Sequence, residues 1–586
     1  MNFIGINSIV KIYNLLNVIQ RKKVFYLIIL IFFSSAFELL GLGLIIPSIS
    51  ALVDPNYLNQ FAKHSLIKYF FNDPSQGNII YAGIFIIILI YLLKNLFLSY
   101  SIFWQNKFAA DFQADISSKL FSKYLNKDFS FHLNNNSSGL IRNINELVPN
   151  VYSSLLAIMT LFMEIVIMLS IMILLIKIET LGTIVIMVFG IIIGFLFSKV
   201  ARSIILEWGH KKVFHQGKSI QSVMEGLGGI KMIKILGREK EFQNKLSNHL
   251  KKYINFERLN STFQQFPRVW LEFVAILSLC ILLFSIFYQG KNYDSILPII
   301  ALFTGAAFKL IPSTSKILSS IQTLGFNQSA VDIVYNDLRN SNENLIKNDQ
   351  NVSEEIFFNI GKIQINNISY KYTQENLPII KNLSLEIKNG ASVGIIGETG
   401  SGKSTLVDIL LGLLKPKSGQ ILINGIDIHQ TRYQLRQWQK HIGYVPQDIY
   451  LMDDTIANNI IFGLNKKLID KKALNYSLKY AQLDNFINSL PNGIETKVGE
   501  RGVRLSGGQL QRIGIARALY HNPSILIFDE ATSSLDYDTE DAIVDCIDQL
   551  EGKTKIIIAH RLSSVKNCDY LIKIDKGSIE KIEKLE

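Results

Sequence analysis

The chain has little charge and almost no cysteine for its 586 residues. Charged residues make up 18% of it, against about 25% in an ordinary soluble domain. Hydrophobic residues make up 48%, and the mean hydropathy of +0.24 excludes a disordered or fibrous chain and argues against a purely soluble enzyme. The three cysteines, Cys280, Cys546 and Cys568, are too few and too scattered for a disulfide framework or a cysteine metal site.

The net charge of +12 comes from the apolar half of the chain. Residues 1–320 contain 30 Lys and Arg against 16 Asp and Glu, whereas residues 321–586 contain 30 against 32. A basic excess confined to the apolar half indicates membrane topology. We therefore expect a membrane-embedded protein and no nucleic-acid partner.

Six apolar stretches are long enough to cross a membrane. At 1.5 Å per residue, about 20 helical residues span a hydrocarbon core of about 30 Å. Lys and Arg are concentrated before the first stretch and in 104–150 and 207–268, which places these segments in the cytoplasm. The sequence predicts a multi-pass protein of the plasma (inner) membrane with both termini inside and spans at about 24–53, 79–103, 151–176, 180–206, 269–288 and 294–320.

The spans are expected to continue beyond the membrane. Residues 104–135 and 218–260 have apolar side chains at three- and four-residue intervals, which predicts long cytoplasmic helices. We expect short connectors near Asn134–Arg142 and near Glu207–Gly217. The apolar spacing in residues 1–20 predicts an amphipathic helix at the membrane interface.

The domain boundaries follow from changes in composition. Residues 1–320 are expected to form the transmembrane domain with its cytoplasmic helical extensions, and the polar residues 321–358 a linker. Residues 359–586 alternate between strand and helix patterns and are expected to form an α/β domain. Between the first two spans, residues 56–71 fit either an amphipathic helix on the outer leaflet or a plain linker.

The second domain contains a predicted phosphate-binding loop. A predicted strand over residues 392–396 runs into Gly397–Ser404, a complete GxxxxGK[ST] motif in a strand–loop–helix context. Glycines let backbone N–H groups converge on phosphates, Lys403 reaches the β- and γ-phosphates, and Ser404 gives a hydroxyl to Mg²⁺. The predicted loop residues are Gly397, Glu398, Thr399, Gly400, Ser401, Gly402, Lys403, Ser404 and Thr405.

Two further motifs complete the expected nucleotide site. An apolar strand ends in Asp529 and Glu530, where Asp529 is expected to hold Mg²⁺ and Glu530 to act as the general base on water. The run Ser506-Gly507-Gly508-Gln509 precedes a helix containing Arg512 and Arg517, which predicts an anion-binding helix start.

The order of these motifs resembles that of ATP-binding cassette (ABC) transporters. With the six spans, the resemblance covers the whole chain and implies an exporter-type α-helical membrane domain followed by an α/β P-loop cassette that hydrolyses ATP with Mg²⁺. By resemblance, Tyr372 stacks on adenine, Gln447 senses Mg²⁺ and His560 contacts the γ-phosphate. Asp536 closes the matching Ser533–Asp536 run. Relatives complete each ATP site with the signature serine of another cassette, which implies a homodimer, with a heterodimer as the alternative.

Four cations in or beside the spans are candidates for contact with cargo: Lys94, Arg268, Lys309 and Lys316. Ionisable groups at membrane depth are costly and are functional by default. Lys94 and Lys309 each lie about 15 residues, or roughly 22 Å, from the outer end of their span. The four predict a cavity for an anionic headgroup such as phosphate or pyrophosphate.

Structural pairing is the alternative to a cavity. Glu38, Glu164 and Glu272 also lie in the spans. Arg268 is four residues from Glu272 and Lys94 has Glu38 as a partner, while Lys316 is near enough to the cytoplasm to snorkel.

The membrane domain also resembles flippases of lipid-linked oligosaccharides, through Glu38, Lys94, the run Phe266–Glu272 and the run Phe308–Pro312. This resemblance implies flipping of a pyrophosphate-linked lipid from the inner to the outer leaflet. An exporter of other lipids, peptides or amphiphilic drugs remains open. An ATP-gated channel or regulatory subunit is a further alternative, against which the intact Glu530 and signature run argue.

Overall fold

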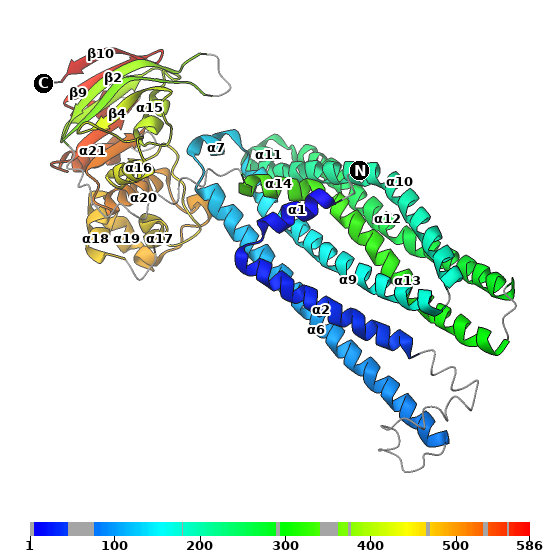
Figure 1. Cartoon of the computed structure of the whole chain (residues 1–586). Helices are drawn as coiled ribbons and strands as arrows, with labels where there is room; N and C mark the ends of the chain where they lie inside the picture. Colours follow the sequence, from blue (N-terminus) through cyan, green and yellow to red (C-terminus); the bar gives the residue numbers. More distant parts are fainter. Residues whose placement is uncertain are drawn as a thin grey trace. The chain divides into compact units, whose positions relative to one another are not determined.

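The computed structural model describes residues 5–44, 76–178, 180–288, 293–339, 361–372, 377–464, 469–530, 537–559 and 562–585. The chain divides into two compact units (Figure 1). Met1–Lys127 and His132–Ser341 form the first, which we call the helical unit. Asp128–Phe131 and Asn342–Glu586 form the second, the α/β unit.

Long helices make up the helical unit. The six predicted apolar stretches fall in α2, α6, α9, α10, α12 and α13, although the first continues past the described end of α2. By length and composition, three segments of the described helices could cross a membrane: Val18–Gly41, Ile84–Leu125 and Ser137–Ile178. The elements are α1 (Ile6–Leu15), α2 (Val18–Gly43), α6 (Gln76–Leu125), α7 (Phe129–Asn134), α8 (Ser137–Arg142), the π-helix η1 (Asn143–Leu147), α9 (Val148–Ile178), α10 (Thr180–Gly228), α11 (Ile230–Leu236), α12 (Glu239–Tyr288), α13 (Tyr293–Phe326) and α14 (Gln328–Arg339).

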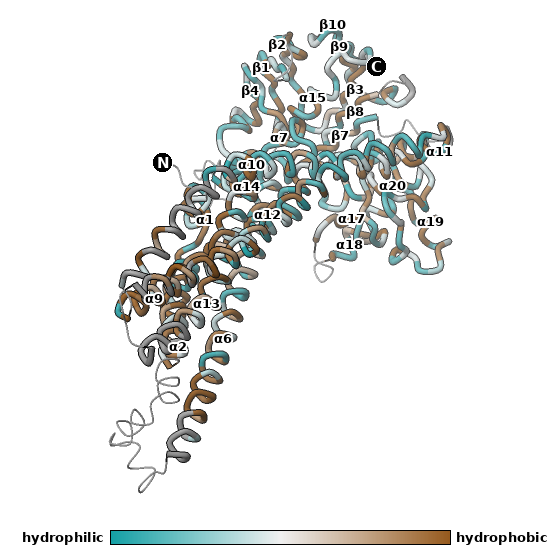
Figure 2. The backbone as a smooth tube through the Cα atoms, turned by 90° about the vertical axis from the view of Figure 1, so that its right-hand side faces the viewer, coloured by the Kyte–Doolittle hydropathy of each residue, from teal (hydrophilic) through white to brown (hydrophobic). Residues whose placement is uncertain are grey.

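The predicted extension of the spans is confirmed in α6, which continues without interruption to Leu125. Phe108, Phe112, Ile116 and Leu120 recur at four-residue intervals and are buried. This spacing places them on one face of the helix, so packing holds the helix together beyond its apolar part. Figure 2 shows the change along α6 from hydrophobic to hydrophilic residues.

The connector expected near Glu207–Gly217 is wrong, because this segment lies inside the unbroken helix α10. A Cβ on Gly209 would lie 2.1 Å from the backbone oxygen of Phe326 in α13. The glycine therefore permits close packing of two helices and does not mark a loop. The chain turns instead around α11, which ends at Leu236 and is followed by Gly237 with a left-handed backbone (φ 63°).

The first part of the predicted 321–358 linker is also helical. Residues 321–326 form the end of α13 and residues 328–339 form the whole of α14, and they belong to the helical unit. Ala330, Val331 and Val334 are fully buried, so α14 is held by its apolar face although its composition is polar. The predicted amphipathic segment 56–71 lies outside the described residues.

The α/β unit contains two sheets. One has the strand order β2-β1-β4-β5 and is antiparallel, and the other has the order β10-β9-β3-β8-β7-β6, with a parallel centre. The strands are β1 (Lys362–Tyr370), β2 (Ile380–Lys388), β3 (Ser392–Gly397), β4 (Ser418–Ile423), β5 (Ile426–Asp427), β6 (Ile442–Val445), β7 (Ile525–Asp529), β8 (Thr554–Ile558), β9 (Tyr570–Asp575) and β10 (Ser578–Lys584). The helices are α15 (Lys403–Leu410), α16 (Arg432–Lys440), α17 (Ile456–Ile461), α18 (Lys471–Tyr480), α19 (Asp484–Ser489), α20 (Gly507–Tyr520) and α21 (Tyr537–Asp548).

The register of the parallel strands brings two predicted motifs to one edge. On β8, Ile558 pairs with Ile395 of β3 on one side and with Asp529 of β7 on the other. The phosphate-binding loop therefore leaves β3 at the edge where β7 ends in its two carboxylates. Ligands of open α/β sheets bind at this carboxyl edge.

One apolar core fills the space between the two sheets, α15 and α16. Trp438 of α16 is its largest buried side chain, at 1% exposure, and its indole N–H donates to the carbonyl oxygen of Leu410 at 2.7 Å. That carbonyl is the last of α15, which has no partner of its own within the helix. The tryptophan thus closes the helix that follows the phosphate-binding loop.

Trp438→Ala should destabilise the α/β unit by about 3–5 kcal/mol, because it opens a cavity and leaves a buried carbonyl unpaired. In calorimetry of the full chain in detergent, the unfolding transition of the α/β unit should fall by about 8 °C or more. Trp438→Phe keeps most of the apolar volume, so its unfolding temperature should lie between those of the parent and Trp438→Ala. A shift of less than about 2 °C for Trp438→Ala would show that this contact is dispensable.

Candidate functional site

The phosphate-binding loop is formed as predicted, between β3 and α15. Gly400 and Gly402 have φ of 84° and 103°, a left-handed backbone that favours glycine. The Lys403 ammonium donates to the carbonyl oxygens of Gly397 and Glu398, at 2.7 and 2.9 Å. The loop is therefore closed around its own lysine.

The loop fits a phosphate group. Its Ser401 hydroxyl is buried, and among the described residues it has no hydrogen-bond partner. A buried hydroxyl without a partner is unfavourable, so a phosphate oxygen at the loop would complete it. The predicted residues Thr399 and Ser404 lie in and directly after the loop, and Ser404 is exposed.

Tyr372 lies beside the loop. Its hydroxyl is 3.3 Å from the hydroxyl of Thr405, in the first turn of α15. Its ring meets that of Tyr370 edge-on, with centroids 5.2 Å apart. This contact fixes an aromatic face next to the phosphate-binding loop, where a base could stack.

Asp529 and Glu530 lie at the end of β7 and differ in environment. Asp529 is buried and accepts a hydrogen bond from the Tyr444 hydroxyl at 3.4 Å. Burial raises the pKa of Asp529, and the neighbouring charge of Glu530 adds to this effect, while Tyr444 and Lys403 oppose it. A nearby cation would relieve this cost, so Asp529 is suited to holding Mg²⁺.

Glu530 has a strained backbone and a polar partner. Its φ of 51° lies in the left-handed region, which is unusual for a residue other than glycine and is typical of functional sites. Its carboxylate accepts a hydrogen bond from the Gln447 amide at 2.7 Å. The structure thus brings together two of the predicted catalytic residues, and this arrangement fixes the direction of the Glu530 carboxylate.

Lys403 is electrostatically linked to both carboxylates. Burial lowers the pKa of its ammonium, and the charges of Glu530 and Asp529 raise it again. Ser404, Gln447 and Asp529 carry the oxygen ligands that Mg²⁺ prefers, and these residues would hold the ion. When bound, Mg²⁺ neutralises charge on phosphate oxygens.

The sequence reasoning missed Asp408, a carboxylate in α15 close to this site. Burial raises its pKa to about 6, and the charge of Asp529 contributes. The signal was available, since Asp408 is the acidic residue in the otherwise apolar run Leu406–Leu411. Tyr444, which orients Asp529, left no comparable signal because strands commonly contain tyrosine.

The signature run begins α20 as predicted. Ser506 is the N-cap, its hydroxyl accepts from the Gln509 backbone N–H, and the Gln509 side chain accepts from the Ser506 backbone. Gly507 and Gly508 fill the first turn. Among the described residues, no hydrogen bond or ion pair joins this run to Gly397–Thr405 of the same chain. Asp536 and His560, which were also predicted, lie outside the described residues.

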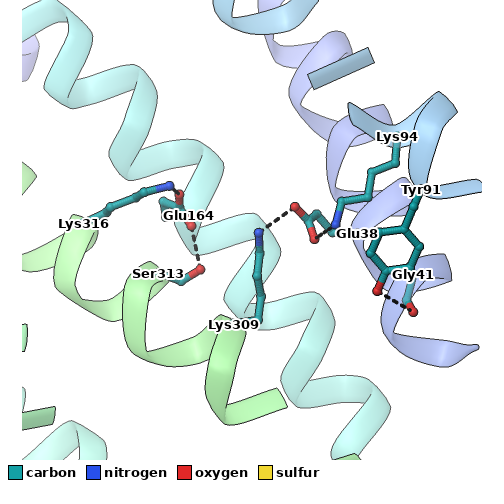
Figure 3. A network of polar contacts seen from close by, with 8 residues as sticks. All are labelled: Glu38, Gly41, Tyr91, Lys94, Glu164, Lys309, Ser313 and Lys316. Carbon is teal, nitrogen blue, oxygen red and sulfur yellow. Dashed lines mark hydrogen bonds and ion pairs between the residues drawn. The ribbon is translucent and has the colours of Figure 1, made fainter. Parts of the chain in front are cut away.

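The structure pairs each predicted cargo-binding cation with a carboxylate. Lys94 and Lys309 both contact Glu38, at 2.9 and 2.6 Å (Figure 3). Lys316 contacts Glu164 at 2.7 Å, while the exposed Arg268 lies 3.8 Å from Glu272.

The four cations are therefore not one unpaired cluster. Lys94 and Lys309 converge, whereas Lys316 and Arg268 each have a separate carboxylate. No sequence pattern indicates that Lys309 and Glu38, 271 positions apart, would meet.

Comparison with known proteins identifies the family. Residues 380–533 match the sequence model of the ABC transporter family, and residues 24–306 match that of the ABC transporter transmembrane region. Together these matches cover about three quarters of the chain. The chain belongs to the ABC transporter family. The α/β unit is its ATP-binding cassette, and the predicted fold class is confirmed.

Two similar proteins are named ATP-dependent lipid A-core flippases. The one from Saccharophagus degradans is 34% identical over 379 residues, which are 63% of this chain and 62% of that protein. The one from Bordetella avium is 43% identical over 220 residues, or 37% of each chain. The chain thus matches less than two thirds of the length of these relatives.

Solved structures show the same fold. A bacterial Atm1-family ABC exporter with ATP bound superposes with a TM-score of 0.78 at 21% identity, covering 97% of this chain and 96% of the other. At this identity the likeness establishes the exporter fold and leaves the cargo open.

Glu530→Gln should preserve ATP binding and reduce hydrolysis by about 10²–10⁴-fold, because the attacking water loses its base while Lys403 remains. ATPase assays and nucleotide-binding measurements on the full chain would check this. Glu551→Gln makes the same change on the surface of the cassette and should alter neither quantity. Turnover by Glu530→Gln near the parental rate would remove Glu530 from the role of general base.

Proposed function

We propose that this chain is an ATP-driven transporter that flips an anionic, pyrophosphate-linked lipid from the inner to the outer leaflet of the plasma membrane. The observation that supports the cargo is a buried carboxylate, Glu38, shared by two lysines of different helices. The cluster retains a net positive charge inside the transmembrane region. Uncompensated charge at such depth is costly and is retained for function.

ATP hydrolysis would take place at the cassette site. Lys403 and the loop glycines would bind the β- and γ-phosphates, and Tyr372 would stack on the adenine. Gln447 holds the Glu530 carboxylate in place, so that Glu530 can take a proton from the attacking water. The buried Asp529 would remain ionised beside a cation, and Tyr444 limits its rotation.

A second copy of the chain would complete each site. Ser506–Gln509 is intact and pre-formed at the start of α20, yet within the part that the structure describes no hydrogen bond or ion pair joins it to the loop of its own chain. In ABC relatives the signature serine caps ATP on the other cassette. A homodimer therefore supplies two complete sites, and a heterodimer remains the alternative.

The exposed apolar side chains of α11 also favour an interaction with a partner. Ile230, Met232, Ile235 and Leu236 are exposed on this seven-residue helix. Basic residues flank them, which places α11 in the cytoplasm by the distribution of charge. Clustered exposed apolar side chains are typical of an interaction surface. A cassette of the dimer is the partner that the exporter fold offers.

The names of the two flippase relatives, which refer to lipid A-core, support a lipid as the cargo. An anionic headgroup agrees with the lysines of the Glu38 cluster. An exporter of peptides or amphiphilic drugs would not need two lysines at this depth. A channel would not need the general base Glu530.

Lys94→Gln together with Lys309→Gln should lower the flipping of a fluorescent prenyl pyrophosphate lipid by about tenfold or more, because the headgroup loses both ammonium partners. The measurement is lipid moved per ATP hydrolysed in proteoliposomes, which separates cargo handling from cassette activity. Lys119→Gln together with Lys211→Gln removes two exposed lysines and should leave this ratio unchanged.

Equal flipping by the double variant and the parent would contradict the pyrophosphate-lipid proposal. ATP-dependent ion conductance without lipid movement would favour the channel.

A further inference from the structure

Three helices meet at Glu38. The carboxylate comes from α2, Lys94 from α6 and Lys309 from α13 (Figure 3). One carboxylate oxygen contacts each ammonium, at 2.9 Å for Lys94 and 2.6 Å for Lys309. The side chain of Glu38 is 3% exposed, so the two lysines are its main substitute for water.

The two lysines differ in accessibility. Lys94 is 12% exposed, and its ammonium also lies 4.8 Å from the ring centre of Tyr91, whose hydroxyl donates to the carbonyl oxygen of Gly41. Lys309 is 32% exposed. Lys94 is therefore held from two sides, whereas Lys309 presents a face that a ligand can reach.

A second ion cluster on α9 and α13 has no spare charge. Glu164 accepts from Lys316 and from the hydroxyl of Ser313, both at 2.7 Å (Figure 3). One carboxylate and one ammonium cancel there. The Glu38 cluster has two ammonium groups and one carboxylate, so the excess charge of this part of the membrane domain lies at Lys94 and Lys309.

An anionic ligand of these lysines has to compete with the Glu38 carboxylate, which already contacts both. A phosphate that contacts Lys309 approaches the oxygen of Glu38, and like charges at short distance repel. The ligand must therefore attract the lysines more strongly than one carboxylate does. A pyrophosphate carries several negative charges and many acceptor oxygens, whereas a single carboxylate or phosphodiester carries one negative charge.

We propose that Glu38 is a resident counter-ion that selects for multiply charged headgroups by competing with them for Lys309 and Lys94. This proposal rests on the proposed function and names the residue that sets its headgroup selectivity. In the absence of cargo Glu38 neutralises one of the two ammonium charges. When a pyrophosphate headgroup binds, its oxygens replace the carboxylate at Lys309 first, because Lys309 is the more accessible lysine.

A double-mutant cycle tests this role. The ligand is farnesyl pyrophosphate, and its affinity is measured by calorimetry on the full chain in detergent, with ADP saturating the cassette so that pyrophosphate cannot bind at the phosphate-binding loop. Lys94→Gln leaves Lys309 neutralised by Glu38, and its affinity should fall by about tenfold or more. Glu38→Gln removes the competitor, and its affinity should rise by about fivefold or more.

The decisive variant combines Glu38→Gln with Lys94→Gln. It removes one charge of each sign, so it leaves no excess charge beyond that of the parent and avoids the folding risk of Glu38→Gln alone. Lys309 is then free of its competitor, and affinity should recover to within about threefold of the parent. If the double variant binds as weakly as Lys94→Gln or more weakly, Glu38 only positions the lysines and the proposal is wrong.

Two further measurements complete the test. Glu257→Gln breaks a different ion pair, in which the buried Lys212 lies 2.6 Å from Glu257, and should leave affinity unchanged. If Glu257→Gln raised the affinity for farnesyl pyrophosphate as much as Glu38→Gln does, the competition could not be assigned to Glu38. Inorganic pyrophosphate should bind at least about tenfold more weakly than farnesyl pyrophosphate, since it lacks the apolar tail. Equal affinity would show that the site does not recognise a lipid.

Failure of the transport proposal is distinguishable from failure of this one. If no lipid moves with ATP but the cycle behaves as expected, Glu38 is a counter-ion at an anion site and the transport proposal is wrong. If lipid moves but the cycle does not recover, transport stands and the counter-ion role is wrong.

Discussion

A carboxylate buried among membrane helices has to be paired, and this constraint organises the centre of the membrane domain. Glu38 is almost inaccessible, and two lysines from separate helices compensate it. Each ion pair ties α2 to another helix, so the position of α6 and α13 relative to α2 depends on the same three side chains. The pairing leaves one excess positive charge, and an anionic cargo is the simplest group that would neutralise it.

In the cassette, buried charge likewise needs a partner, but there the excess charge is negative. Asp529 and Glu530 place two carboxylates at the end of a buried strand, and Lys403 is the nearby cation whose charge opposes the raised pKa of Asp529. Both sites therefore hold an imbalance of charge within a closed environment. In the cassette a bound cation would correct it, and in the membrane domain an anionic headgroup would. Each imbalance is relieved only when the ligand binds.

Sequence patterns predicted the cassette well because its motifs are local. The loop Gly397–Ser404, the strand ending at Asp529 and the helix after Ser506 all form where the residues indicate. The membrane domain was harder, because Gly209 marks close packing inside a helix and resembles a turn in sequence. Long-range pairs such as Glu38 with Lys309 depend on helix packing and leave no periodic signal. The strained backbone of Glu530 likewise follows from its surroundings and not from its residue type.

The most direct test of the account is a structure of the nucleotide-free chain in lipid nanodiscs with farnesyl pyrophosphate bound, determined by electron cryo-microscopy. The account predicts phosphate oxygens within hydrogen-bond distance of the Lys309 and Lys94 ammonium groups, and the Glu38 carboxylate displaced from Lys309. A headgroup bound elsewhere, with both lysines still on Glu38, would contradict it.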